Sequence, residues 1–278
     1  MKKGRYYRME EKNHLQNDAG GAAEFEAGMI VKGIEISWTT WGRMRGERLI
    51  TGPVSYLKAE GDSGFERIYS VDMKENQELE IPKMISLIKA GILPDSILIT
   101  PMTRPSNLAE ILANRGFVVN EQPPCILLYL DNFRENRYLI NQYTISEVTK
   151  MAELKSWLDI INKNLFEGEL VTTEQFGDVL RLDNTSFYLG FSEGRPVSTC
   201  MTISDGDTAI LEMAATLKDY RCRGFASCLI RKALADLQEK GIRTVSLRAE
   251  EDGVGVYTRL GFKACFNRVI AFYNRKSI

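Results

Sequence analysis

The sequence predicts an α/β (α+β) fold in which helices flank a mixed, mostly antiparallel sheet, built as two modules in tandem. Three observations lead to this prediction. An apolar strand at residues 208–216 runs into a basic turn and an amphipathic helix. A strand, a short helix, a Gly-Phe pair and further β-rich sequence follow at residues 244–273. The same order of elements occurs earlier, at residues 97–130, which indicates an internal repeat.

The basic turn is the most informative segment of the chain. It has the pattern Arg221-x-x-Gly224-x-Ala226 and precedes a helix predicted over residues 227–239, with Gly241 at the expected C-cap. A strand-to-helix junction offers free backbone N–H groups and the positive end of a helix dipole. Arg221 and Arg223 add charge, and the small residues allow close approach to the backbone. The turn therefore suits a diphosphate, although taken alone it is equally typical of a solvated helix N-terminus.

The turn and the sequence after it resemble the GNAT N-acetyltransferase superfamily. The spacing matches the Gln/Arg-x-x-Gly-x-Gly/Ala signature of motif A, and residues 253–262, with Tyr257 before Gly261-Phe262, are similar to the end of motif B. The resemblance implies the GNAT acyl-CoA N-acyltransferase fold, with acetyl-CoA as cosubstrate and its diphosphate on the turn. Two positions depart from the common pattern: Cys222 is the first variable residue of the turn, and Thr216-Leu-Lys replaces a frequent Val-x-Pro.

The resemblance also assigns roles to residues. Tyr257 is the expected general acid for the CoA thiolate, with a core packing role as the alternative. Glu212, in phase with Ala214 and Thr216 on the strand, is a candidate base, and a salt bridge is an equal alternative. Thr216 would lie nearest the thioester carbonyl. The expected cofactor-binding residues are Met213, Ala214, Ala215, Thr216, Arg221, Cys222, Arg223, Gly224, Phe225 and Ala226.

Composition excludes several other classes of protein. The chain has 278 residues and a net charge of −1, which gives no support to a nucleic-acid or membrane partner. The single histidine, His14, lies in a polar segment, so His-dependent nucleophilic catalysis and a metal site are not expected. Five cysteines without paired spacing favour a reducing, cytoplasmic environment. The expected partners are acetyl-CoA and an amine acceptor, and the expected state is a monomer or homodimer.

We predict a polar leader at residues 1–23, a degenerate GNAT-like module at 24–135 and a catalytic GNAT domain at 136–278. In the first module the pattern predicts strands at 29–38, 48–58, 66–72 and 97–100, helices at 83–90 and 107–115, and a strand pair around a turn at 122–124. Trp38 and Trp41 would pack on opposite faces of the first strand. In the second, helices are predicted at 145–164 and 172–182, strands at 187–191, 195–204, 208–216 and 244–247, and two short strands at 263–273. The first module has no basic glycine turn between residues 66 and 97.

These predictions favour an enzyme that transfers an acetyl group from acetyl-CoA to a primary amine by direct attack. The degenerate module would close one wall of the acceptor pocket. The main alternative is a non-catalytic acyl-CoA-binding or regulatory protein of the same fold. An aminoacyl transferase fed by charged tRNA would need a broad basic face, which the charge does not support. The sequence leaves the acceptor open among small amines, amino acids, polyamines, aminoglycosides and peptide termini.

Overall fold

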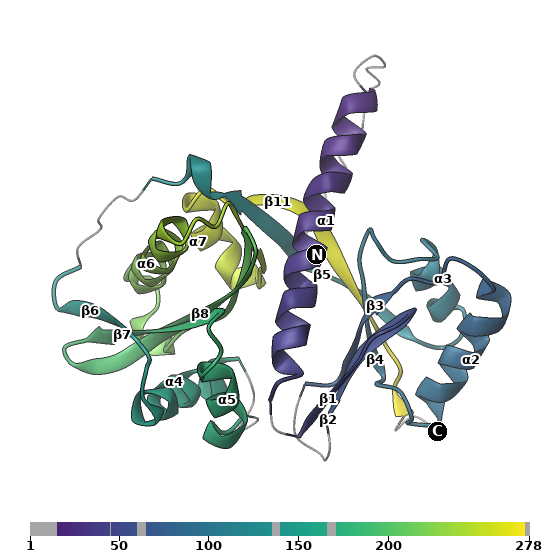
Figure 1. Ribbon diagram of the computed structural model, residues 1–278, viewed down its shortest axis with the longest axis horizontal. Helices are drawn as coiled ribbons and strands as arrows, with labels where there is room; N and C mark the ends of the chain where they lie inside the picture. The colour runs from purple at the N-terminus through teal and green to yellow at the C-terminus, as the bar shows by residue number, and fades with distance from the viewer. Residues whose placement is uncertain (1–15, 45, 60–64, 135–139, 166–170, 276–278) are drawn as a thin grey trace, which may run out of the picture.

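A computed structural model describes residues 16–44, 46–59, 65–134, 140–165 and 171–275 (Figure 1). In these residues eleven strands form one sheet, in the order β1-β2-β3-β4-β11-β5-β10-β9-β8-β7-β6. The strands are β1 (Glu47–Ile50), β2 (Val54–Ala59), β3 (Arg67–Val71), β4 (Ser96–Ile99), β5 (Val118–Tyr129), β6 (Tyr143–Glu147), β7 (Thr185–Ser192), β8 (Arg195–Asp205), β9 (Thr208–Thr216), β10 (Thr244–Arg248) and β11 (Lys263–Phe272). The α-helices are α1 (Gln16–Trp41), α2 (Gln77–Lys89), α3 (Leu108–Ala113), α4 (Met151–Asn164), α5 (Thr173–Leu180), α6 (Phe225–Glu239) and α7 (Val254–Arg259).

The two halves of the chain exchange strands at the centre of the sheet. The last strand, β11, lies between β4 and β5 and is antiparallel to both, and β5 in turn pairs with β10. Figure 1 shows β11 running from the C-terminal lobe towards β4, while β5 runs the opposite way. The structure therefore has one continuous sheet in which each half contains a strand from the other. The predicted modules at residues 24–135 and 136–278 divide the sequence, but strands of each module pair with strands of the other in this sheet.

Two predictions about these central strands are wrong. Residues 122–124 do not form a turn, and residues 263–273 do not form two strands, because β5 and β11 are each a single long strand. Proline cannot donate a ladder hydrogen bond and is tolerated in strands chiefly at edges and irregularities. The β5–β11 pairing shifts register between Ala264 and Phe266 and between Asn267 and Val269, and Pro124 is paired with Asn267 between these shifts. The irregular pairing accommodates the prolines within the strand.

The prediction of a strand at residues 29–38 is also wrong, because these residues lie within helix α1. Its β-branched residues favour a strand locally, but Ile30, Ile34, Trp38 and Trp41 recur at helical spacing and are buried on one face. Trp38 stacks on Tyr69 with ring centroids 5.7 Å apart, and Trp41 stacks on a second ring. Residues 16–23, within the expected leader, form the first turns of α1, and residues 1–15 lie outside the described residues.

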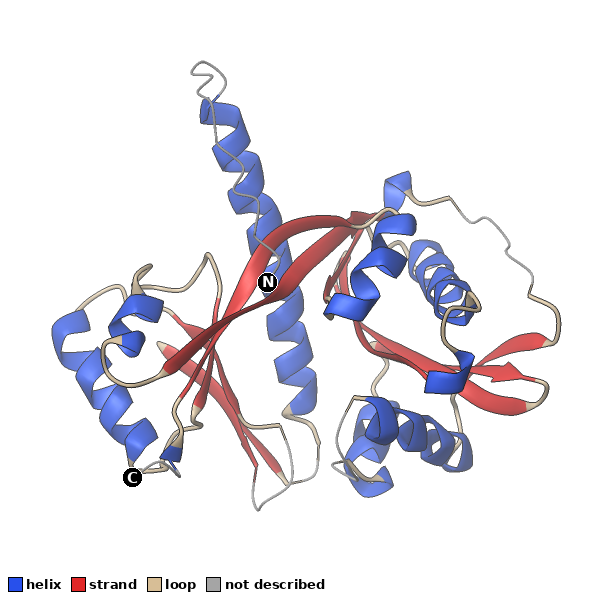
Figure 2. Cartoon of the chain, turned by 180° about the vertical axis from the view of Figure 1, so that it is seen from behind, coloured by secondary structure: helices blue, strands red, loops and turns tan. Residues whose placement is uncertain are grey.

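Helix α1 lies across the middle of the sheet and contacts strands of both halves, including β9, β10, β5 and β11 (Figure 2). It shares a core with α4 and α5, whereas α6 and α7 pack in a second core. Gly33 allows the close approach of α1 to β10, because a Cβ atom there would overlap the Oγ atom of Ser246.

Most of the local predictions in the C-terminal half are confirmed. Thr172 caps α5 by accepting a hydrogen bond from the N–H of Gln175, and Gly241 follows α6 with φ = 80°. The helix predicted from residue 145 begins instead at Met151, because Ile145 lies in the edge strand β6. No helix in the described part of the chain is long and apolar enough to cross a membrane.

Candidate active site

Strands β9 and β10 separate at the point where the cofactor strand was predicted. Their parallel pairing ends at Ile210 and Ser246, and the rest of β10 pairs only with β5. On its other side β9 keeps its pairing to β8 as far as Thr216, with an irregularity between Glu212 and Ala215. Met213 lies in that irregularity with φ = 51°. The β9 backbone at residues 212–216 is therefore unpaired on the side that faces β10.

The turn before α6 presents a row of free backbone donors. The N–H groups of residues 222–227 donate to no group among the described residues, and the first helical bond runs from the N–H of Cys228 to the carbonyl of Gly224 at 3.0 Å. Cys222 and Gly224 have left-handed backbones, with φ of 61° and 84°. Successive N–H groups in such a turn make a concave site for an anion, and the helix dipole reinforces it. A diphosphate fits this donor set.

The side chains of the turn mainly hold its shape. The Nε atom of Arg221 donates to the carbonyl of Thr216 at 3.1 Å, which links the turn to the end of β9. Arg223 is exposed, and its guanidinium lies over the ring of Tyr220. Phe225 is buried and stacks on Tyr143 with ring centroids 4.5 Å apart. Phe225 therefore anchors the helix, and only its backbone N–H group is available to a ligand.

Tyr257 lies on α7 with its ring buried against Phe262. Its hydroxyl has no hydrogen-bond partner among the described residues. Burial raises the pKa of Tyr257 above its usual value, and nearby anionic groups, including the Glu212 carboxylate, raise this pKa further. The phenol is therefore protonated at neutral pH and can act as a proton donor.

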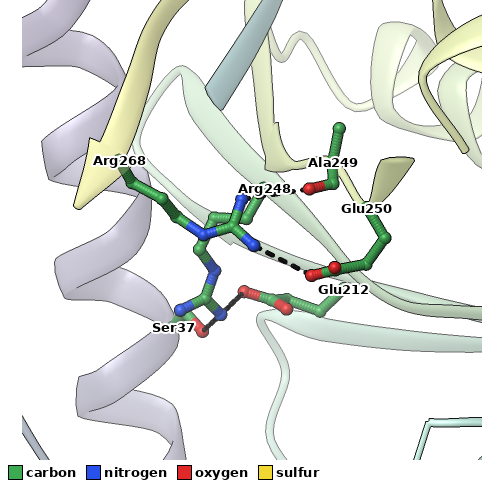
Figure 3. Close-up of polar contacts among 6 residues, drawn as sticks. All are labelled: Ser37, Glu212, Arg248, Ala249, Glu250 and Arg268. Atoms are coloured by element: carbon green, nitrogen blue, oxygen red, sulfur yellow. Dashed lines mark hydrogen bonds and ion pairs between the residues drawn. The ribbon is translucent and has the colours of Figure 1, made fainter. Parts of the chain in front are cut away.

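Glu212 is held by two partners that the sequence did not indicate (Figure 3). Its carboxylate forms an ion pair with Arg248 of β10 and accepts a hydrogen bond of 2.8 Å from the Oγ atom of Ser37 on α1. The Glu212 and Arg248 side chains are only 10% and 17% exposed, so the pair is largely shielded from solvent. A charged residue at the end of a buried strand is a signal that could have identified Arg248. Ser37 could not be identified, because residues 29–38 were predicted to be a strand and lie in helix α1.

Arg268 of β11 links this strand to β5 and to the end of β10, beside the Glu212–Arg248 ion pair. Its guanidinium donates to the carbonyl of Ala249 at 3.0 Å and to the Glu250 carboxylate at 2.8 Å (Figure 3). It also donates to the carbonyl of Pro123 at 2.9 Å. Arg268 therefore fixes β5 and β11 against the end of β10, where β9 and β10 have separated.

A cavity of about 890 Å³ lies at the corresponding strand-to-helix junction of the N-terminal half, between β3 and α2. Its lining includes Asp72, Glu75 and Glu80, and the first turn of α2 carries Glu78 as well as Glu80. Acidic groups beside a helix N-terminus compete with an anionic ligand for the same donors. Lys74 and Lys83 also line the cavity, but they form ion pairs with Asp72 and Glu80, so the lining differs from the row of free backbone donors before α6.

No group of three His, Cys, Asp or Glu residues in the described ranges is placed to hold a metal ion. Residues 151–262 match the model of the family described as "Acetyltransferase (GNAT) family". No curated protein sequence matches the chain.

Solved structures are similar over almost the whole chain. A GCN5-related N-acetyltransferase from Kribbella flavida is 18% identical with a TM-score of 0.66, and the match covers 90% of this chain and 95% of that one. A GCN5-related N-acetyltransferase from Sphaerobacter thermophilus is 14% identical with a TM-score of 0.57, covering 90% and 93%. A putative GNAT-family acetyltransferase from Novosphingobium aromaticivorans is 15% identical with a TM-score of 0.51, covering 88% and 94%. At these identities the likeness establishes the fold, which confirms the predicted fold class.

Proposed function

We propose that this chain, whose residues 151–262 match the model of the GNAT acetyltransferase family, transfers the acetyl group of acetyl-CoA to a primary amine. The separation of β9 from β10 beside the free N–H groups of residues 222–227 is the observation that carries the proposal. Members of this family generally use acetyl-CoA as cosubstrate. In this chain the turn would hold the diphosphate, and the unpaired β9 backbone at residues 213–216 would bind the remainder of the cosubstrate.

Two side chains would move protons in this reaction. Tyr257 would donate its phenol proton to the leaving CoA thiolate, since burial keeps it protonated. Glu212 would accept a proton from the acceptor amine, directly or through water. For Glu212 to do so its carboxylate must keep one oxygen available beside Arg248 and Ser37.

The alternative function is a non-catalytic acyl-CoA-binding or regulatory protein. The Glu212–Arg248 ion pair favours it, because the carboxylate then has a structural partner on β10 and holds that strand to β9. Both functions use the same acyl-CoA site, and they differ in turnover.

Calorimetric titration with acetyl-CoA, followed by measurement of free-thiol release with a panel of amines, tests the proposal. We expect one acetyl-CoA per chain and thiol release that depends on the amine. Saturable binding without turnover on any amine would support the binding protein. Two equivalent sites per chain would show that the N-terminal half also binds the cosubstrate.

A further inference from the structure

Two arginines from opposite halves of the chain meet at the ring of Trp38 on α1. The guanidinium carbon of Arg67, on β3, lies 5.9 Å from the ring centroid, and that of Arg248 lies 5.7 Å from it. Arg248 also forms the ion pair with Glu212. The Trp38 ring therefore connects a cation of the N-terminal half to the candidate base of the C-terminal half.

The positive charge of this cluster is not fully balanced. Arg248 pairs with Glu212 and Arg268 pairs with Glu250, but Arg67 has no carboxylate within ion-pair distance among the described residues. Its Nε atom donates to the hydroxyl of Ser96 at 3.1 Å, and its two terminal nitrogens donate to no described residue. Two of the three guanidinium groups thus have an ion-pair partner, and that of Arg67 has none among the described residues.

The surroundings of Arg67 make its missing partner costly. Burial, together with repulsion from Arg248 and Arg268, lowers the pKa of Arg67 to about 10. A partly buried cation is stabilised when an anion takes the place of the lost water. The indole N–H of Trp38, a residue only 4% exposed, is a second buried donor of this cluster that lacks a partner in the described part of the chain.

We propose that Arg67, Arg248 and the indole N–H of Trp38 bind a carboxylate carried by the amine acceptor. The acceptor is then an amino acid or another amine with a free carboxylate. A carboxylate would give Arg67 the ion-pair partner that it lacks among the described residues, and arginine binds a carboxylate through two parallel hydrogen bonds. The proposal rests on the proposed acetyl transfer and specifies its substrate class. It also gives the N-terminal half a role, because Arg67 and Trp38 both belong to that half.

Matched acceptors test the proposal with the unaltered protein. Thiol release is measured with the standard amino acids, with their carboxamides and with spermidine. We expect the carboxylate to raise kcat/KM by roughly 10–100-fold over the carboxamide of the best acceptor, as the loss of a charged hydrogen bond implies. Equal rates for acid and amide would overturn the proposal, as would a preference for O-phosphoethanolamine over β-alanine.

Variants then test the residues. Arg67→Gln should raise KM for the carboxylate acceptor about tenfold or more, leave kcat nearly unchanged and leave the carboxamide within about twofold. Arg67→Lys, which keeps the charge, should recover part of the loss, and the exposed Arg48→Gln is the matched control. An unchanged acid-to-amide ratio in folded Arg67→Gln would overturn the assignment.

Calorimetry of the same amino acids with the protein separates this proposal from the acetyl transfer. If no amine gives turnover, the proposed function fails. Amino-acid binding that is lost in Arg67→Gln would then still support the subsite, and absence of binding would overturn it as well.

Discussion

Replacing Tyr257 by phenylalanine separates a catalytic role of this residue from a packing role. The ring is buried against Phe262, and a Cβ atom on Gly253 would come within 2.9 Å of it, so the ring itself is closely packed. The hydroxyl, in contrast, has no protein partner among the described residues. Its removal should therefore change the free energy of unfolding by less than about 1 kcal/mol, because no protein hydrogen bond is lost.

The effect on the rate should be much larger. Loss of a positioned acid typically lowers kcat about 10²–10⁴-fold, and the lower end is expected because a thiolate is already a good leaving group. The assay is single-turnover thiol release at saturating acetyl-CoA, with affinity for acetyl-CoA measured separately and expected to stay the same. Tyr257→Ala serves as the contrast, since deleting the whole ring should cost about 3–5 kcal/mol of stability.

Two outcomes would refute this reasoning. An unchanged single-turnover rate in Tyr257→Phe would leave Tyr257 as a packing residue. A decrease in stability as large as that of Tyr257→Ala would show that the hydroxyl has a structural partner. The raised pKa also predicts no fall in the wild-type rate from loss of this proton below about pH 10; a descending limb below that pH that disappears in Tyr257→Phe would contradict it.

The remaining predictions concern the turn, a buried carboxyl group and the seat of α1. Gly224→Glu should abolish the thermal stabilisation by acetyl-CoA, which is about 2.7 kcal/mol at a hundredfold excess over Kd. The control Gly194→Glu, which changes a glycine of similar positive φ in a hairpin, should retain this stabilisation. If acetyl-CoA raises the Tm of Gly224→Glu as much as that of the wild type, the turn is not the cofactor site. Burial raises the pKa of Glu47 to about 7, so its contribution to stability is present below the unfolded value near 4.5 and is lost as the pH rises through 7. Glu47→Gln should therefore raise Tm relative to wild type more at pH 8 than at pH 5, and an equal difference at both would refute the shift. Gly33→Ala should lower the free energy of unfolding by about 1–3 kcal/mol, because its Cβ atom would overlap the Oγ atom of Ser246. Adding Ser246→Ala should restore most of this stability, since the two Cβ atoms would lie 3.6 Å apart. Additive effects of the two changes in denaturant unfolding would argue against this contact.

The C-terminal half could be predicted from sequence because its signals are local. The capping residue Thr172, the glycine after α6 and the strand-to-helix turn each determine the backbone within a few residues. The prediction that the turn suits a diphosphate depends on its backbone geometry, which its residue types largely determine. Tyr257 and Glu212 could be located in the fold for the same reason, and their roles stay predictions.

What could not be predicted depends on contacts between distant segments. Residues 29–38 have the composition of a strand, and only packing across the sheet makes them helical. The pairing of β5 with β10 and of β11 with β4 leaves no trace in local periodicity. Ser37 contacts Glu212, and Arg67 and Arg248 meet at Trp38, only through these arrangements, so the sequence could not predict these contacts.

The exchange of β5 and β11 has a consequence for the order in which this protein can be completed during synthesis. The ribosome makes β4 and β5 long before β11, the strand that separates them. Until residues 263–272 emerge, the nascent chain carries open strand edges at what will be the middle of its sheet, and such edges invite pairing with other chains. A chain that stops before residue 263 would therefore lack a central strand of the sheet. Such a product should be a target for chaperones and proteases, because β4 and β5 would each have an unpaired edge.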